Sequence, residues 1–272
     1  MKQIIADKYK DLEKFLNKSK IHYQEAKPFP FIEIDNFFDE KFLDDVLQSF
    51  PKLSEKKHNH NMNIPTEVKL GINSPELIPD KINEFIEYLN SYFFLNFLQK
   101  LTGINESLIP DPYLFGGGLH EIKKGGFLKI HSDFNVHPQL SLNRRINLLL
   151  YLNKSWNEEW GGHLELWDRN MKKCGAKISP TFNKLVIFNT TDFSFHGHPE
   201  PLKCPDNVTR KSLALYYYTN GRPKNEINFD HGESGQTTLF QKREGSEDNF
   251  STNRIKFKKI FGKFYIRTKE KY

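Results

Sequence analysis

His131 and Asp133 place an imidazole and a carboxylate two positions apart in Leu128–Asp133, a segment that reads as a strand. Side chains two apart on a strand project from the same face, so these two point the same way. An imidazole from a facing strand would complete a triad of two histidines and one carboxylate. Such a triad leaves coordination positions open and suits Fe(II) oxygen chemistry. The pair alone is a weak signal, and it predicts a metal centre only together with a second histidine and a cation further along the chain.

A second imidazole is available well downstream, where a partner strand could come alongside. Two candidates, His196 and His198, lie in the segment Phe193–Pro201. They share the same strand parity, so residue chemistry alone does not choose between them. Pro199 indicates that the strand ends there. Both histidines remain open as the third ligand at this point.

A cation opens the next strand-like run, Thr209–Tyr218. Arg210 lies fourteen residues after His196. A guanidinium there can make a two-point contact with a carboxylate of a bound diacid. Lys211, one residue on, should face the opposite side of the strand.

The elements that must position these residues begin at Tyr113, where the character of the chain changes. Short apolar runs then alternate with Gly, Pro, Asn and Asp, a pattern typical of short strands and turns. We expect strands at 117–122, 127–133, 144–153, 162–167, 184–189, 194–198 and 211–219. Gly116, Gly117 and Gly118 lack the Lys-Ser/Thr and helix of a phosphate loop, which favours close strand packing.

The first hundred residues are expected to be mainly helical. The apolar spacing predicts helices at 7–19, at 39–50 with Asp39 as cap and Pro51 as stop, and at 75–102 with Gly103 at the end. A strand is expected at 29–37. The polar, His-rich stretch 54–63 is interpreted as a solvated loop, and the tail ends in a strand-like run at 258–266.

This order of elements predicts an α+β fold: a double-stranded β-helix (jelly roll) with N-terminal helices packed on one sheet. We divide the chain into a mainly helical layer (1–112), a jelly-roll core (113–220) and a C-terminal extension (221–272). All three are expected to form one structural domain. The helical layer and the extension are expected to shape substrate choice.

Composition excludes several classes of protein. The 272 residues carry a net charge of +6, and 14% of them are aromatic, which argues against disorder. Cys174 and Cys204, the only cysteines, exclude a disulfide scaffold and are expected to be free thiols. No apolar run could span a membrane and no signal peptide is recognised, so we expect a cytoplasmic protein. The sequence predicts neither a nucleic-acid partner nor a particular oligomeric state.

In this order, the motifs resemble those of Fe(II)- and 2-oxoglutarate-dependent oxygenases of the prolyl-4-hydroxylase-like superfamily. The resemblance covers about 113–220 and is weaker at 29–50. An isolated His-x-Asp pair is common, whereas the ordered set is specific. The matching pieces are His131-Ser132-Asp133, the strand 144–153, the turn and strand Trp160–Trp167, His196 and Arg210.

The resemblance implies that His131, Asp133 and His196 hold Fe(II). The family pattern places the distal ligand at the histidine that opens a His-x-x-Pro-Glu segment, which selects His196 over His198. Arg210 then pairs with the 5-carboxylate of 2-oxoglutarate. Members often carry a tyrosine nine residues before the first histidine. Ile122 stands there in this chain, so Asn147 and Tyr151 are the expected substitutes.

The implied reaction is hydroxylation of an unactivated C–H bond, with O2 as reactant and release of succinate and CO2. Relatives that halogenate replace the carboxylate ligand with a small residue, so Asp133 favours hydroxylation. Ascorbate is a candidate reductant. The substrate class stays open between a small molecule, a glycan and a peptidyl residue such as proline.

Five residues are expected near the substrate: Asn135 and His137 in the loop after the ligand pair, and Arg145, His163 and Trp167. Asn135 and His163 could instead support the metal ligands through hydrogen bonds. Two alternative functions compete with the oxygenase. One is a cupin-type metalloprotein that does not use 2-oxoglutarate, and the other is a binding jelly roll. Arg210 discriminates, because only the oxygenase needs a cation for the co-substrate.

Overall fold

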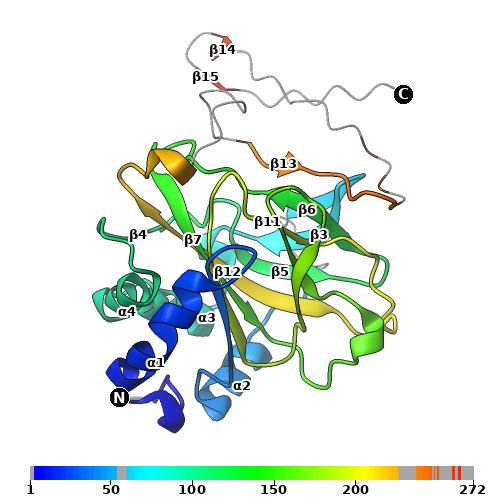
Figure 1. The fold of residues 1–272 in the computed structure, drawn as a ribbon. Helices are drawn as coiled ribbons and strands as arrows, with labels where there is room; N and C mark the ends of the chain where they lie inside the picture. Colours follow the sequence, from blue (N-terminus) through cyan, green and yellow to red (C-terminus); the bar gives the residue numbers. More distant parts are fainter. Residues whose placement is uncertain are drawn as a thin grey trace.

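A single large antiparallel sheet curls into a barrel and forms the body of the protein (Figure 1). This computed structural model describes residues 3–53, 60–226, 237–246, 248 and 250, and the backbone of 259–260 and 263–264. The barrel with its helices is the double-stranded β-helix that the strand pattern predicts. Within the described residues, no helix is both long and apolar enough to cross a membrane.

The sheet runs in the order β1-β10-β7-β12-β5-β3-β6-β11-β8-β9. β4, β2 and β13 attach to β12, β3 and β6. The strands are β1 (Phe31–Asp35), β2 (His60–Ile64), β3 (Glu67–Ile72), β4 (Ile109–Pro110), β5 (Gly118–Ile122), β6 (Phe127–Ser132), β7 (Asn143–Tyr151), β8 (Leu164–Trp167), β9 (Cys174–Ile178), β10 (Lys184–Asn189), β11 (Phe195–His198), β12 (Arg210–Thr219) and β13 (Leu239–Phe240). β14 (Lys259–Ile260) and β15 (Lys263–Phe264) form a separate pair.

β7 and β12 divide the inside of the molecule into two environments. Alternate residues of β7, namely Ile146, Leu148 and Leu150, pack into the large apolar core together with Leu213 and Leu215 of β12. The intervening residues face the interior of the barrel, because successive strand side chains point to opposite faces. The same two strands therefore seal the helical layer on one side and line the functional cavity on the other.

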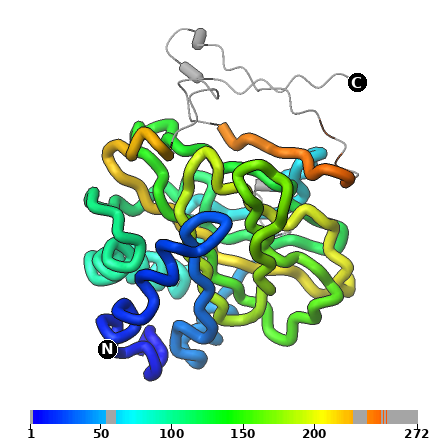
Figure 2. The backbone as a smooth tube through the Cα atoms, in the orientation of Figure 1, coloured from blue at the N-terminus to red at the C-terminus, as the bar shows by residue number. Residues whose placement is uncertain are grey.

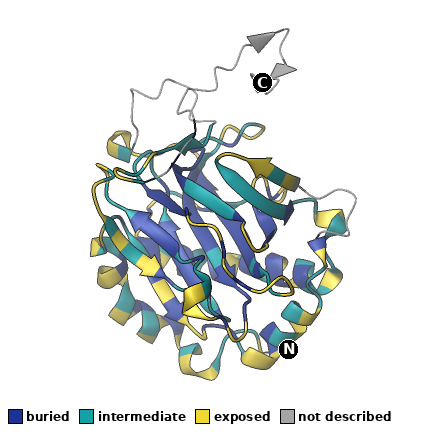
Figure 3. Ribbon diagram, turned by 90° about the vertical axis from the view of Figure 1, so that its right-hand side faces the viewer, coloured by how far each residue is buried: buried dark blue, intermediate teal, exposed yellow. Residues whose placement is uncertain are grey.

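The helices cover the core face of this sheet, with their outer surfaces exposed (Figure 3). They are α1 (Leu12–Glu25), α2 (Glu40–Gln48), α3 (Asp80–Leu89) and α4 (Tyr92–Thr102), with short 3-10 turns at Asp7–Tyr9, Pro75–Leu77, Glu158–Trp160 and Lys224–Glu226. Packed aromatic rings join them to the sheet: Phe38 meets Phe85 edge-on at 4.9 Å, and Phe37 stacks on Phe97 at 5.6 Å. Such pairs add to the burial of apolar surface.

The helix caps explain where the predicted helices begin and end. Asp39 caps α2 as expected, because its side chain accepts a hydrogen bond from Phe42 N at 2.8 Å. The expected 7–19 helix instead begins after Asp11, whose side chain accepts from Lys14 N. The expected long helix at 75–102 is two helices, because Ser91 caps a new start while Asn90 ends the first. Gly103 ends α4 in the left-handed conformation, as predicted.

The first 112 residues also supply four strands to the sheet. The prediction of a loop at 54–63 was wrong for its last residues, since His60–Asn63 belong to β2, which forms a hairpin with β3. Residues 54–59 lie outside the described part, as does most of the strand-like run at 258–266. Gly118 packs closely as expected, because a Cβ there would lie 2.1 Å from Ile72 O.

Candidate metal centre

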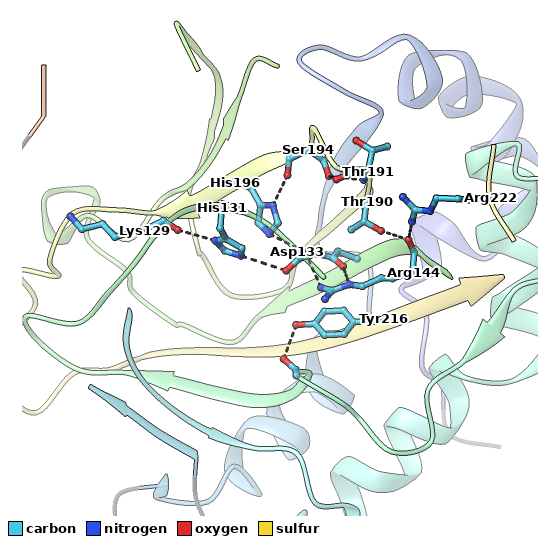
Figure 4. Close-up of polar contacts among 12 residues, drawn as sticks. Lys129, His131, Asp133, Arg144, Thr190, Thr191, Ser194, His196, Tyr216 and Arg222 are labelled. Carbon is cyan, nitrogen blue, oxygen red and sulfur yellow. Dashed lines mark hydrogen bonds and ion pairs between the residues drawn. The ribbon is translucent and has the colours of Figure 1, made fainter. Parts of the chain in front are cut away.

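Antiparallel pairing of β6 with β11 brings the predicted triad together (Figure 4). His131 lies directly opposite His196, and their ring centroids are 4.5 Å apart. The Nε2 atoms of His131 and His196 lie 3.5 Å and 3.4 Å from the carboxylate oxygens of Asp133. One ligand atom from each of the three residues lies within 4.8 Å of the other two. The arrangement is therefore compact enough to surround one metal ion.

Each histidine ring of the triad is held by the backbone carbonyl two residues before it. His131 Nδ1 donates to Lys129 O at 2.8 Å, and His196 Nδ1 donates to Ser194 O at 2.9 Å. A carbonyl oxygen only accepts, so Nδ1 carries the proton in both neutral rings. The Nε2 lone pairs are then free, and both face Asp133. This is the tautomer that metal coordination through Nε2 requires.

Asp133 is buried and surrounded by donors. Its Oδ2 accepts a hydrogen bond from Asn147 Nδ2 at 2.8 Å and lies 3.0 Å from the Arg144 guanidinium. Burial alone would raise the pKa of this carboxyl, but Arg144 and His196 hold it well below its usual range. Asp133 is therefore a carboxylate at neutral pH, as a metal ligand must be.

Burial also keeps His196 neutral, because it lowers the pKa of this ring to about 4 against the opposing effect of Asp133. Only the neutral imidazole can donate its lone pair to a metal ion. At neutral pH the triad therefore combines the charged carboxylate of Asp133 with the uncharged imidazole of His196.

Arg144 enters this site because β7 contains a bulge. On β12 the neighbours Tyr217 and Tyr218 oppose Ile146 and Arg144, which leaves Arg145 as the extra residue on β7. Arg144 then shares the face of Asn147 and donates from Nε to its side-chain oxygen at 2.8 Å. The guanidinium also stacks 3.3 Å from the ring of Tyr216.

A cavity of about 310 Å³ extends from the triad into the barrel. Arg210 lines it, with its guanidinium held by Gly162 O at 2.8 Å and the Tyr151 hydroxyl at 3.2 Å. Arg210 is only 4% exposed, and the structure gives it no carboxylate partner among the described residues. An isolated buried cation is costly, so this position favours an anionic ligand.

His198 lines the same cavity but is separate from the triad. The register between β11 and β6 shifts after His196, so His198 pairs with Leu128 instead of a ligand residue. Its ring is 3% exposed, and neither nitrogen has a hydrogen-bond partner among the described residues. Burial and Arg210 lower its pKa well below the usual value. The structure thus brings His196, and not His198, to Asp133.

Two residues that the sequence associated with 2-oxoglutarate have different surroundings. Tyr151 lies in the cavity beside Arg210. Asn147 also lines the cavity, but its amide donates to Asp133 and accepts from Arg144. Its hydrogen bonds therefore connect it to the triad.

None of the five residues expected near the substrate lines the cavity. His137 is fully buried, and its Nδ1 accepts from the backbone of Gln139 and Leu140. The bulge turns Arg145 away from the site, where it pairs with Glu106 and Glu226. The remaining three bond elsewhere: Trp167 to Glu165, His163 to Glu158 and Asn135 to Asp192. Within the described part of the chain, neither Asn135 nor His163 makes a hydrogen bond to a triad residue, so neither supports the triad directly.

Among the residues that line the cavity, Lys69, Arg144 and Phe240 were not assigned to the site from the sequence. Lys69 forms a 2.9 Å ion pair with Glu67, and both come from the unpredicted β3. The sequence did contain one signal for this strand. Glu67 and Lys69 are two positions apart in Glu67–Ile72, so on a strand both charged side chains would point to the same, inward face. Phe240 comes from the C-terminal extension, where no pattern indicated contact with the barrel.

Comparisons with known proteins agree with this geometry. Residues 117–218 match the family described as 2OG-Fe(II) oxygenase superfamily. Prolyl 3-hydroxylase OGFOD1 of Mus musculus is 35% identical over 79 residues, which are 28% of this chain and 14% of that protein. The chain thus covers only a small part of the length of this relative.

Solved structures show the same fold. A prolyl hydroxylase from Trichoplax adhaerens, in complex with a hypoxia inducible factor peptide fragment, aligns with a TM-score of 0.56 at 18% identity, over 78% of this chain and 92% of that chain. A prolyl 4-hydroxylase from Phytophthora capsici aligns with a TM-score of 0.53 at 19% identity, over 77% and 65% of the two chains. Residues 117–218 therefore match the 2OG-Fe(II) oxygenase superfamily, and the chain has the fold of the solved prolyl hydroxylases.

Proposed function

We propose that the protein is an Fe(II)- and 2-oxoglutarate-dependent dioxygenase that hydroxylates a C–H bond of its substrate, with release of succinate and CO2. The family match supports the class of reaction. The observation that carries the proposal is the combination, in one cavity, of a His-Asp-His cluster and a buried arginine that has no carboxylate partner among the described residues.

The donor set of His131, Asp133 and His196 fits Fe(II). Two imidazole nitrogens and one carboxylate oxygen form the facial triad typical of non-haem iron oxygenases. The Nδ1 protons of both rings are already engaged by backbone carbonyls, which leaves Nε2 for the metal. These three residues would hold the ion from one side and leave its cavity side open for ligands.

The residues around Arg210 fit the distal carboxylate of 2-oxoglutarate. The guanidinium uses Nε and one Nη2 contact, so it can still donate to an anion. Tyr151 holds it from one side, and His198 adds two free ring nitrogens to the cavity. We therefore assign Arg210, Tyr151 and His198 to the co-substrate.

When bound, Fe(II) and 2-oxoglutarate would supply the oxidising chemistry with O2. The residues of the chain would orient the metal-binding side chains and shield the reacting groups. Arg144 and Asn147 fix the carboxylate of Asp133, and the backbone carbonyls of Lys129 and Ser194 fix the two rings.

OGFOD1 and the Trichoplax adhaerens protein are prolyl hydroxylases, so a peptidyl proline is one candidate substrate. Small molecules and glycans are the others. Cys174 and Cys204 are free thiols, which fits our placement of the protein in the cytoplasm.

Thermal unfolding with Mn(II) and 2-oxoglutarate tests the proposal. A ligand that binds only the folded state raises the melting temperature. We expect Mn(II) to stabilise the wild type and 2-oxoglutarate to add a further increase. Arg210→Ala should lose only the second increase, whereas Lys211→Ala, which removes the next cation on the opposite face, should keep both.

The alternatives give different results. A cupin-type metalloprotein would respond to Mn(II) and not to 2-oxoglutarate, and a binding jelly roll would respond to neither. Arg210→Lys keeps a charge in the cavity and controls for a general loss of folding. Either alternative pattern in the wild type would refute the oxygenase.

A further inference from the structure

The C-terminal strap, defined as residues 237–246, 248 and 250, lies beside the metal-binding strand (Figure 2, orange). β13 pairs with β6 so that Phe240 lies opposite His131 and Leu239 opposite Ser132. Gln241 N extends this pairing with a 2.8 Å hydrogen bond to Ile130 O. The strap therefore covers the edge of β6 at the position where β6 presents its metal ligand.

Phe240 is the strap residue closest to the chemistry. Its ring centroid lies 5.4 Å from that of His131, and the residue lines the cavity together with Thr238. Phe250, which is 6% exposed, packs edge-on against Phe240 at 6.2 Å. Leu239 does not line the cavity, as expected for a neighbour on the opposite face of a strand.

A buried ion cluster fastens the strap to the barrel. The side chain of Asp248 is 1% exposed, and it accepts from Arg243 Nε at 3.0 Å and from Arg243 Nη2 at 3.1 Å. It also lies 2.8 Å from Lys129 Nζ, which comes from β6. Arg243 pairs in addition with Glu200, just after β11, at 2.7 Å.

The cluster thus connects the strap to both strands that carry the histidines of the triad. Burial by itself would raise the pKa of Asp248, but Arg243 and Lys129 hold it well below the usual range. Removing one member of a buried ion pair is strongly destabilising, because it leaves the partners without compensation. The buried ion cluster therefore holds the strap, and Phe240 with it, in a fixed position on the barrel.

The cavity volume of about 310 Å³ lies at the lower end of the range for small-molecule sites. The co-substrate would take part of that volume. The cavity lining includes the aromatic side chains of Phe115, Phe134, Tyr216 and Phe240 beside polar ones such as Lys69 and Thr238. The remaining space suits a slender group, such as a proline ring or a short aliphatic side chain, better than a bulky aromatic group.

We infer that Phe240 is a specificity-determining residue, which the strap holds against His131 as a wall that limits the width of the group presented to the metal. The inference rests on the proposed function and adds to it a residue outside the family match and a class of substrate group. Truncating the ring widens the cavity at the metal and leaves the Arg210 end unchanged.

The test uses the full chain with Mn(II) and 2-oxoglutarate bound, and measures the relaxation of water protons by Mn(II). Phe240→Ala should raise this relaxation above the wild-type value, because more water reaches the ion. Leu239→Ala is the matched control and should not. Binding of Mn(II) and 2-oxoglutarate is measured in the same samples and should stay at the wild-type level.

A second measurement uses Fe(II) and acetylated, amidated Gly-X-Gly peptides with X as Pro, Leu or Phe, and follows succinate release. In Phe240→Ala, the stimulation of succinate release by the Phe peptide, relative to that by the Pro peptide, should be about tenfold greater than in the wild type. This is in the range expected when a pocket admits a larger group.

Asp248→Asn tests the anchor. Amide hydrogen exchange in residues 237–246 should be faster than in the wild type by at least about tenfold, because Lys129 and Arg243 lose their buried partner. Glu244→Gln makes the same chemical change at an exposed strap position and should leave exchange unchanged.

The inference is overturned if Phe240→Ala gives wild-type water relaxation, or if Leu239→Ala gives the same increase as Phe240→Ala. Failure of Mn(II) or 2-oxoglutarate to bind the wild type refutes the proposed function instead. If Mn(II) and 2-oxoglutarate both bind but Phe240→Ala does not change water relaxation, only the proposed role of Phe240 is refuted.

Discussion

The guanidinium of Arg144 lies 3.0 Å from Asp133 Oδ2, the oxygen that also accepts the 2.8 Å hydrogen bond from Asn147. The arginine is 1% exposed, so this is a buried ion pair. In the metal-free protein Arg144 compensates the negative charge of Asp133. A divalent metal ion on the same carboxylate would provide the same compensation from the other side.

Arg144→Met should therefore destabilise the metal-free protein by about 3–5 kcal/mol, because Asp133 becomes a buried charge without a partner. Mn(II) should restore part of this loss, so the increase in melting temperature on adding Mn(II) should exceed that of the wild type. Thermal unfolding with EDTA and with Mn(II) measures both effects. A smaller metal response in the variant would show that Arg144 mainly orients the ligand.

The two histidines of β11 should give separate phenotypes. His196→Ala removes a ring that faces Asp133, and we expect a loss of Mn(II) affinity greater than the about 10- to 100-fold typical of outer-shell partners. His198→Ala should retain Mn(II) affinity and weaken 2-oxoglutarate binding. Titration calorimetry with each ligand distinguishes them. Equal losses of Mn(II) affinity would contradict the assignment of the ligand.

Tyr151→Phe should lower the affinity for 2-oxoglutarate about fivefold, because it removes one neutral hydrogen-bond partner of Arg210. Tyr217→Phe is the matched control. It removes a buried hydroxyl that donates to Leu89 O on the helical side of the same sheet. The control should reduce stability without changing 2-oxoglutarate affinity, and calorimetry at a temperature where both variants are folded gives the comparison.

Stability of the metal-free protein should fall as the solution becomes more acidic than the ordinary histidine pKa of 6.5. Burial lowers the pKa values of His137, His196 and His198, that of His196 to about 4. The unfolded state then binds more protons than the folded state between pH 6.5 and about pH 4. Stability is therefore fully present above pH 6.5 and is lost as the pH falls towards the folded-state values.

Urea unfolding at about pH 7 and about pH 5 should show this loss, and His198→Gln should make it smaller. A free energy of unfolding that is constant or higher at the lower pH would mean that these rings are not buried as neutral groups.

Asn183 should be important for docking the helices. Its side chain donates to Phe38 O at 2.8 Å and accepts from Phe38 N at 3.1 Å, both in the interior. Asn183→Ala leaves these backbone groups unsatisfied and should lower the free energy of unfolding by about 2–4 kcal/mol. Asn170→Ala, at an exposed turn, should change it by less than about 0.5 kcal/mol. Equal effects would exclude this role.

The barrel strands could be predicted because their alternation and turn residues are local signals. The metal cluster could be located for the same reason, since a two-residue spacing on a strand sets the direction of both side chains. The pairing of His196 with His131 is not local. It required the family pattern, and a register shift in β11 decides between the two histidines.

Other features could not be predicted, because they depend on contacts between distant segments. The bulge in β7 exchanges the faces of two adjacent arginines, so the structure places Arg144 at the site where Arg145 was expected. β3 presents the charged residues Glu67 and Lys69 to the cavity, and the polar residues Asn61 and Asn63 of β2 are exposed, so the composition of both strands resembles that of a loop. The strap depends on Asp248 meeting Lys129 across more than a hundred residues.

Each histidine of the triad takes its orientation from a peptide carbonyl two positions earlier in the chain. Most metal-binding rings that depend on a carboxylate or amide can lose their support through one substitution elsewhere. Here any residue at position 129 or 194 supplies the same backbone carbonyl oxygen, provided that the backbone keeps its conformation. The backbone therefore determines which ring nitrogen carries the proton in both histidines. The surrounding side chains can change without altering it.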